Sequence, residues 1–181
     1  MNEAQAQVLQ FLGKYSPDDL AQTEQRALFT AFAGQHAGCC ERQLALGHLT
    51  GSAWLVSKDG QRALLMHHRK LNRWLQPGGH ADGSGDLAQV ALREAEEETG
   101  LAGLSVEPAV FDLDRHRIPA RGAEAEHWHY DVRFVVRANG SEAFIQNGES
   151  LALAWFDIKK LADDGELDES IRRMAKKWIN R

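Results

Sequence analysis

The chain has 181 residues, of which 43% are hydrophobic and 26% charged, a size and composition typical of one globular domain and unlike collagen-like or disordered chains. The formal net charge is −5, which argues against long nucleic acid as a partner, because binding to a phosphate backbone needs a basic surface. The two cysteines are adjacent, Cys39 and Cys40, and the sequence has neither a leader-like start nor an apolar run of membrane length. These features predict a soluble cytoplasmic protein without a membrane partner.

Residues 1–45 are expected to form an N-terminal helical extension. Apolar residues recur at helical spacing toward Gly38, and Ser16 followed by Pro17 is typical of a helix start. From residue 46 onward strand-like patterns begin, so we expect a second domain over residues 46–181. The extension could cover a substrate pocket or form a homodimer interface, and its sequence favours neither.

The second region alternates strand-like and helix-like segments, which predicts an α+β fold. Asp59-Gly60 is a common hairpin turn between two short strands, and Gly78-Gly79 is expected to turn the backbone sharply. Asp86 and Gly100 are typical of the two ends of a helix. The remaining expectations are strands over residues 53–56, 62–67, 104–113, 128–138 and 151–156, a loop over 114–126, and a C-terminal helix from Asp168 or Glu169.

The helix that begins after Asp86 gathers carboxylates on one face. At about 100° per residue, the side chains of Glu94, Glu97 and Glu98 fall within about 100° of one another. Like charges at this spacing destabilise a helix by roughly 0.2–0.5 kcal/mol per pair, so a bound cation would relieve them. Carboxylate oxygens without cysteine or histidine favour Mg²⁺ or Mn²⁺. Taken alone, three glutamates are better explained as a solvated helix face.

The residues around these glutamates reverse that preference, because they match a family signature. The segment resembles the motif of the Nudix hydrolases, in which Gly, five residues, Glu and seven residues precede Arg-Glu-apolar-x-Glu-Glu-x-Gly-apolar. Gly85 stands where the family has its first glutamate. The other eight of the nine specified positions agree, namely Gly79, Arg93, Glu94, Ala95, Glu97, Glu98, Gly100 and Leu101.

The resemblance implies a Nudix-like α/β/α sandwich with a mixed sheet. It also implies metal-dependent hydrolysis of a pyrophosphate bond in a small nucleotide or nucleoside diphosphate derivative. The implied ligands of Mg²⁺ or Mn²⁺ are the carbonyl of Gly79 and the carboxylates of Glu94, Glu97 and Glu98. Arg93 and Glu97 are the implied catalytic residues, Arg93 by fixing a glutamate through a bidentate ion pair.

Two other functions stay open at this point. Because Gly85 replaces a family carboxylate, the chain could be a Nudix-fold nucleotide-binding or sensor protein that does not cleave its ligand. Isopentenyl-diphosphate isomerases resemble the same fold and carry a reactive cysteine near the glycine turn. The cysteines of this chain, Cys39 and Cys40, lie well upstream of that turn, which disfavours the isomerase.

Five further side chains are candidates for substrate binding, each with a structural role as the alternative. Arg69 lies in a basic stretch that could attract phosphate, and Trp74 could stack on a base or pack in the core. His129 and Asp131 share one face of a strand and could line the cavity, whereas a metal site of two histidines and one carboxylate there is the weaker alternative. Glu149 could act as a fourth acidic ligand or a base.

Overall fold

The computed structural model describes residues 1–69, 71–122, 124–146, 148 and 150–181. None of the helices that it describes is long and apolar enough to cross a membrane. The helices are α1 (Glu3–Lys14), α2 (Leu20–Gln35), α3 (Leu87–Thr99), α4 (Ile158–Asp163) and α5 (Glu169–Ile179). The strands are β1 (Gly47–Val56), β2 (Arg62–His68), β3 (Arg73–Leu75), β4 (Gly78–His80), β5 (Leu104–Ile118), β6 (His127–Ala138) and β7 (Ser150–Asp157).

The strands form one mixed sheet with β1 at its centre. The sheet order is β3-β2-β1-β6-β5, β4 pairs with β1, and β7 pairs with β2. Only β1 and β6 run parallel among the paired strands described. Every residue of β1 is buried, as expected for a strand covered on both faces.

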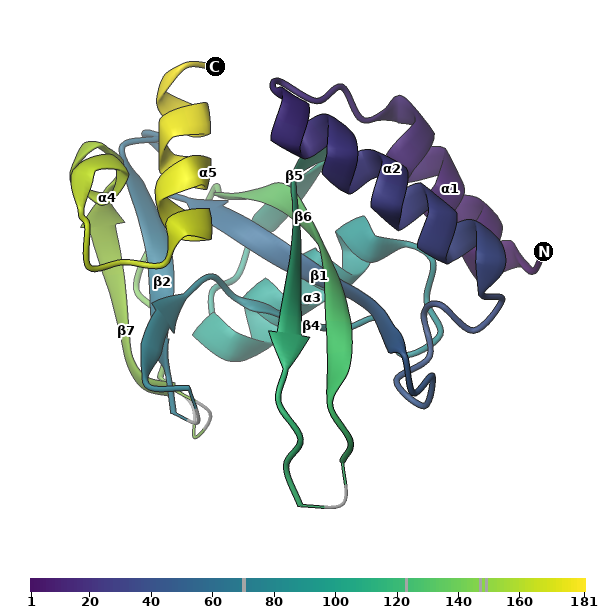
Figure 1. The fold of residues 1–181 in the computed structure, drawn as a ribbon. Coiled ribbons are helices and arrows are strands. Elements are labelled where there is room, and N and C mark those ends of the chain that lie inside the picture. The colour runs from purple at the N-terminus through teal and green to yellow at the C-terminus, as the bar shows by residue number, and fades with distance from the viewer. Residues whose placement is uncertain (70, 123, 147, 149) are drawn as a thin grey trace.

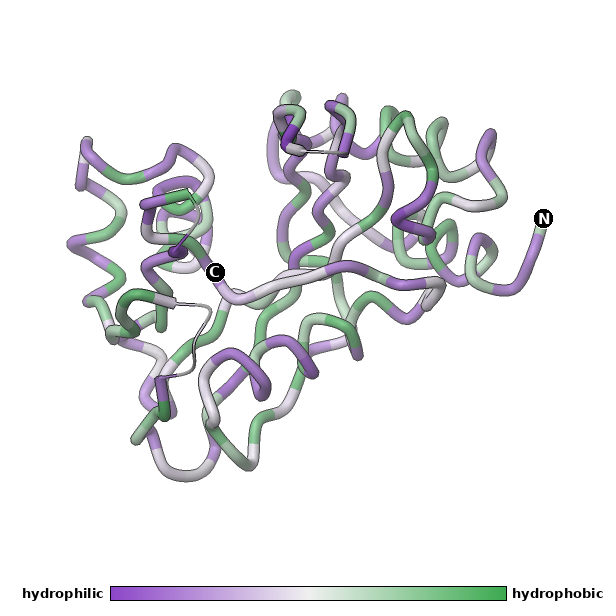
Figure 2. Tube along the Cα trace, turned by 90° about the horizontal axis from the view of Figure 1, so that it is seen from below, coloured by the Kyte–Doolittle hydropathy of each residue, from purple (hydrophilic) through white to green (hydrophobic). Residues whose placement is uncertain are grey.

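Alternating side chains of β1 pack against different helices. Leu49, Ala53 and Leu55 belong to a hydrophobic cluster with residues of α1, α2 and α3, whereas Trp54 and Val56 belong to a second cluster with residues of α4 and α5. Helices α1 and α2 lie on one side of the strands and helices α4 and α5 on the other (Figure 1). The two ends of the chain lie apart in both views (Figure 1, Figure 2). The expected α/β/α sandwich with a mixed sheet is therefore confirmed.

The N-terminal region is helical, but its helix boundaries differ from the expectation. Ser16 and Pro17 lie between two helices, and the carboxylate of Asp19 accepts the N–H of Gln22 at 2.7 Å to begin α2. Side chains such as Phe29, which packs edge-on against Tyr130 of β6 at 5.2 Å between ring centroids, join the extension to the sheet. The proposed division of the chain at residue 46 stays a prediction.

The ends of α3 are confirmed. The carboxylate of Asp86 accepts the N–H of Gln89 at 3.2 Å, and Gly100 ends the helix in the left-handed conformation with φ 65°. Both signals are local, so neighbouring residues in the sequence suffice to specify them.

The glycine pair and the long loop differ from the expectation. Gly78 and Gly79 belong to β4, and the sharp turn lies at Asp82 and Gly83, whose φ angles are 48° and 86°. Strand β5 continues to Ile118, which pairs with His127 of β6, through residues expected to form a loop. In this part of β5 Asp114 contacts Arg133 of β6 and Arg173 of α5, and Arg117 contacts Glu126, so charged residues stand where an apolar alternation would mark a strand. Helix α4 was not expected.

Candidate active site at β4 and α3

Gly79 of β4 lies against Glu94 of the acidic helix. A Cβ atom built on Gly79 would lie 2.5 Å from Oε2 and 2.7 Å from Oε1 of Glu94, so the carboxylate occupies the space that a side chain would need. Gly51, the β1 partner of Gly79, similarly leaves no room for a Cβ beside Leu87 and Val90 of α3. The glycines are required here for close approach rather than for a turn.

Glu98 reaches the same strand one helical turn further along. Its Oε2 accepts the backbone N–H of Gly78 at 2.9 Å, and the residue is only 6% exposed. A buried carboxylate is stabilised by such a hydrogen bond. The bond therefore fixes Glu98 next to Glu94 at the edge of the sheet.

Arg93 links the two more accessible glutamates. Its Nη2 lies 2.9 Å from Oε1 of Glu94, and its Nε lies 3.9 Å from Oε1 of Glu97. The guanidinium thus bridges two carboxylates, whereas the sequence interpretation expected a bidentate pair with one. Glu97 is the most open of the three glutamates, with a side chain that is 64% exposed.

The donor set of this site suits a hard divalent cation. The carboxylates of Glu94 and Glu98 lie against β4 at Gly79 and Gly78, Glu97 lies on the same helix, and oxygen donors are those that Mg²⁺ and Mn²⁺ prefer. The absence of a side chain at Gly79 lets the carboxylate of Glu94 come close to the β4 backbone, so the Gly79 carbonyl and this carboxylate lie near each other. Because Arg93 draws Glu94 and Glu97 toward itself, joint binding of one ion requires rotation of their side chains.

Arg69 and Trp74 make contacts within the protein near β2 and β3. Arg69 donates to the carbonyl oxygens of Gly148 and Ser150 at 3.0 and 3.3 Å. Trp74 stacks on His67 with 5.1 Å between ring centroids and borders a cavity of about 390 Å³. Glu149 lies outside the described residues.

Asp131 lies deep in the sheet, where protein donors surround its carboxylate. It is 1% exposed and accepts hydrogen bonds from Thr50 at 2.8 Å, Ser52 at 2.7 Å and Arg133 at 2.8 Å, with Gln76 at 3.3 Å. A contact between Asp131 and substrate stays a prediction.

A buried charge cluster continues from Asp131 and was missed in the sequence. Arg133 is within 3.5 Å of Asp112 and 3.3 Å of Asp114, and Arg173 of α5 contacts the same two carboxylates at 2.8 and 2.9 Å. Burial would raise the pKa of Asp114, but the charges of Arg133 and Arg173 hold it well below its ordinary value. The polar residues that alternate along β5 and β6 were the feature of the sequence from which this cluster could have been predicted.

His129 lies beside other histidines. Its ring is grouped with those of His48 and His80, and among the residues that the structure describes no site of two histidines and a carboxylate forms on β6. Burial and the neighbouring His48 lower the pKa of His129 to about 2, and burial lowers that of His48 to about 4. Both rings are therefore neutral near pH 7.

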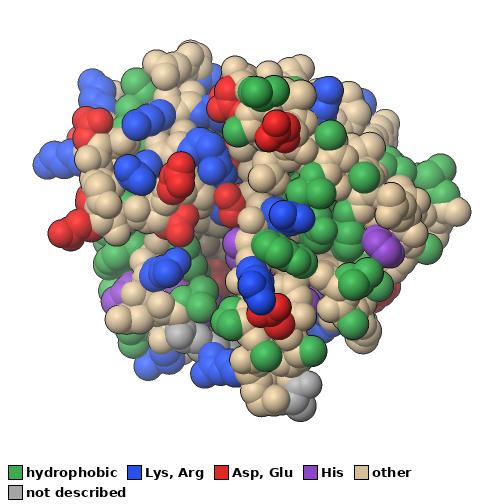
Figure 3. All heavy atoms as spheres, viewed as in Figure 1, with side chains coloured by type: hydrophobic (Ala, Val, Ile, Leu, Met, Phe, Trp, Pro, Cys, Tyr) green, Lys and Arg blue, Asp and Glu red, His purple; other side chains and the backbone are tan. Residues whose placement is uncertain are grey.

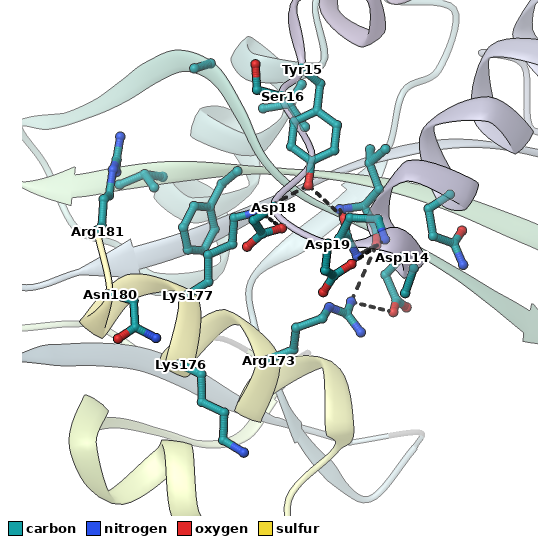
Figure 4. Close-up of a pocket in the computed structure, with 18 of the residues that line it drawn as sticks. Tyr15, Ser16, Asp18, Asp19, Asp114, Arg173, Lys176, Lys177, Asn180 and Arg181 are labelled. Atoms are coloured by element: carbon teal, nitrogen blue, oxygen red, sulfur yellow. Dashed lines mark hydrogen bonds and ion pairs between the residues drawn. The ribbon is translucent and has the colours of Figure 1, made fainter.

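A separate cavity of about 880 Å³ lies between the α1–α2 connection, β5 and α5 (Figure 4). Lys177 crosses it and lies 3.1 Å from both the hydroxyl of Tyr15 and the carboxylate of Asp18. Acidic and basic side chains are interspersed over the side of the molecule where α5 lies (Figure 3). The cavity was not foreseen, because segments from both ends of the chain form it.

Residues 48–178 match the family model described as NUDIX domain. The chain belongs to the Nudix family. This span contains the whole signature from Gly79 to Leu101.

Curated relatives of this Nudix chain are longer proteins. "Putative 8-oxo-dGTP diphosphatase 3" of Mycobacterium tuberculosis is 32% identical over 114 residues, which cover 58% of this chain and 49% of the relative. An m7GpppN-mRNA hydrolase of Xenopus laevis is 29% identical over 123 residues, which cover 60% of this chain and 41% of the relative. The chain thus spans half or less of the length of these relatives.

Solved structures with low sequence identity share the fold. An Ap4A hydrolase of C. elegans superimposes with a TM-score of 0.58 at 17% identity, covering 73% of this chain and 95% of that one. A dihydroneopterin triphosphate pyrophosphohydrolase of E. coli gives a TM-score of 0.59 at 19% identity, covering 74% and 96%. At these identities the comparison shows the Nudix fold alone.

Proposed function

We propose that this chain hydrolyses a pyrophosphate bond in a nucleotide or nucleoside diphosphate derivative, with Mg²⁺ or Mn²⁺ at α3. The observation that carries the proposal is the carboxylate of Glu94 seated against Gly79, with Glu97 and Glu98 on the same helix. The names of the relatives refer to 8-oxo-dGTP, capped mRNA and Ap4A, which supports a nucleotide derivative as the substrate class. Two buried free thiols, Cys39 and Cys40, are compatible with the cytoplasm as its location.

The residues of the site have separable tasks. Glu94, Glu97, Glu98 and the carbonyl of Gly79 would hold the metal, which when bound neutralises phosphate oxygens and lowers the pKa of an attacking water. Arg93 orients Glu94 and Glu97 and balances part of their charge. Without a cation, the carboxylates repel a polyphosphate, so we expect substrate affinity to depend on the metal.

The substrate contacts outside the acidic helix are also proposals. Arg69 supplies positive charge for phosphate oxygens, and Trp74 offers an aromatic face for a base. His129 and Asp131 would form the polar wall of the site, and Glu149 would add an acidic group. A homodimer remains part of the hypothesis for the N-terminal helices.

The test compares two neighbouring glutamates of α3. Glu97→Gln keeps the shape of the side chain but removes its charge, so we expect phosphate release to fall to background at saturating Mg²⁺. Glu96→Gln is the matched control, because Glu96 is exposed and lies outside the specified signature positions. Both variants are assayed against nucleotide sugars, dinucleotides and nucleoside triphosphates. Wild-type turnover by Glu97→Gln would contradict the proposal.

The same panel distinguishes hydrolysis from binding without cleavage, the alternative motivated by Gly85. Calorimetry of the wild-type protein with each nucleotide, in Mg²⁺ and in Mn²⁺, measures binding independently of turnover. A compound that binds while no compound in the panel is cleaved would favour the sensor function. Cleavage of any of them in a metal-dependent manner favours the hydrolase.

A further inference from the structure

A group of histidines lies on the face of β4 opposite the acidic helix. Because successive side chains of a strand point to opposite faces, His80 points away from the side on which Gly79 meets Glu94. His80 instead meets His48 of β1 and His129 of β6. The ring centroids are 5.0 Å apart for His48 and His80, 4.7 Å for His48 and His129, and 5.1 Å for His80 and His129.

The ring nitrogens of this group converge. One nitrogen from each of His48, His80 and His129 lies within 4.8 Å of the other two, and no other group of three acidic, cysteine or histidine side chains does so among the residues described. The three rings come from strands β1, β4 and β6, which are hydrogen-bonded neighbours. The sheet itself therefore sets their relative positions.

His48 lacks the partners that a buried polar ring requires. It is 1% exposed, and within the described part of the chain neither Nδ1 nor Nε2 has a hydrogen-bond partner. Buried polar atoms are nearly always satisfied in folded proteins. A ligand that accepts a nitrogen lone pair would partner one of these two nitrogens.

His127 directs a further lone pair toward the group. Its Nδ1 lies 2.9 Å from the carbonyl oxygen of Ala125, so Nδ1–H is the donor and Nε2 carries the lone pair. This Nε2 lies 3.3 Å from Nε2 of His129. Two nitrogens bound to one tetrahedral zinc ion are separated by roughly 3.3 Å, given bonds of about 2.0–2.1 Å.

We propose that His48, His80 and His129 bind a divalent transition-metal ion of the zinc class, at a site separate from the carboxylates of α3. Imidazole nitrogens select such ions over Mg²⁺. Three histidines leave a fourth position, which His127 or water can fill. Because the nitrogens are now up to 4.8 Å apart, binding draws the rings inward by about 1 Å.

A metal ion at this place would hold three strands together on the face opposite the acidic helix. It would bind β4 to β1 and β6 at His80, the residue that follows Gly79. We expect metal binding to raise the melting temperature of the full chain, because an ion that binds only the folded state stabilises it. This effect does not require hydrolytic activity.

The test uses the metal-stripped full chain in excess Mg²⁺, which would occupy the proposed carboxylate site. Calorimetry with Zn²⁺ and visible absorption with Co²⁺ are expected to show one ion per chain, with the absorption of a tetrahedral centre. His129→Ala and His80→Ala should each weaken Zn²⁺ binding at least about 100-fold. His67→Ala, which removes a ring stacked on Trp74 outside the group, should bind as wild type does.

A second variant separates this site from the proposed hydrolase site. Glu97→Gln should lose hydrolysis and keep the histidine-bound Zn²⁺, whereas His80→Ala should lose the Zn²⁺ whatever the fate of hydrolysis. Circular dichroism identifies variants that fail to fold, and His129→Gln replaces His129→Ala in that case. No uptake of Zn²⁺ by the wild-type chain, or equal uptake by a folded His129 variant, would overturn the proposal.

Discussion

Gly85 contacts Ala4 in the first turn of α1. A Cβ atom at position 85 would collide with the carbonyl oxygen of Ala4 and would lie 2.7 Å from Oε1 of Gln7. The N-terminal extension thus fills the space that a side chain at this position of the Nudix signature would occupy. The departure from the signature has a physical reason in the packing of α1.

Replacing Gly85 with glutamate, which restores the signature, should displace α1. We expect Gly85→Glu to lower the free energy of unfolding by about 1–3 kcal/mol, as overpacking does, measured by urea unfolding. Gly34→Ala is the control, because a Cβ atom on Gly34 of α2 would meet nothing within 4 Å and alanine favours a helix. Equal stability of Gly85→Glu and the wild type would show that α1 does not cover this position.

Gly79→Ala should weaken metal binding beside β4 without lowering the stability of the fold. The added Cβ meets only the carboxylate end of Glu94 among its three nearest contacts, and this flexible end can move aside. We expect unfolding by urea to change little, while the Mg²⁺ concentration for half-maximal turnover rises at least about tenfold, the scale of disturbed metal ligation. Unchanged Mg²⁺ dependence would place the metal away from Gly79.

Arg93→Lys tests whether the bridge between two carboxylates matters. Lysine keeps the positive charge but lacks the planar fork that contacts Glu94 and Glu97 together. We expect turnover at saturating Mg²⁺ to fall about 10–100-fold. The control is Arg117→Lys, which alters an exposed pair with Glu126 on the β5–β6 hairpin and should retain full turnover. Full activity of Arg93→Lys would show that only the positive charge of Arg93 matters and that its contacts with two carboxylates do not.

The buried charge cluster predicts a loss of stability in acid. Burial on its own would raise the pKa of Asp114, but Arg133, Arg173 and a hydrogen bond with His116 hold it below its ordinary value. In the unfolded chain an aspartate titrates near about 3.9, so the unfolded state takes up this proton first. The stabilisation is complete above about pH 5 and is lost as the pH falls through the depressed pKa of the folded state.

Asp114→Asn measures this contribution. At pH 7 it should lower the free energy of unfolding by about 1–3 kcal/mol, and its difference from the wild type should shrink toward pH 3. Urea unfolding over a pH series gives both quantities. Asp163→Asn, at an exposed position on α4, should follow the wild type throughout. A difference that stays constant with pH would exclude a charge effect.

Local signals in the sequence predicted local structure. Asp86 and Gly100 specify the ends of α3, and the helical spacing places Glu94, Glu97 and Glu98 on one face, from which Glu94 and Glu98 meet β4. The sheet class and the α/β/α layering were also predictable, through the resemblance to a family. The predicted element boundaries were wrong where contacts distant in the sequence determine them. In β5, for example, Asp114 contacts Arg133 of β6 and Arg173 of α5.

Long-range pairing explains what the sequence could not predict. His48, His80 and His129 are brought together only by the pairing of β1 with β4 and β6, and strand alternation alone located His129 without its neighbours. Similarly, no pattern in the signature foretells that Ala4 lies against Gly85. Both contacts depend on which segments of the chain are neighbours in the folded molecule.

The pairing of β4 with β1 also constrains how the protein can vary. If β4 slipped by a single residue, an imidazole would be driven beneath Glu94 and a bare glycine would face His48 and His129. The contacts on both faces of β4 would be lost together, so no shifted pairing of this three-residue strand with β1 would be tolerated. We therefore expect no insertions or deletions between Pro77 and Ala81, and expect them instead in the loops before and after this segment.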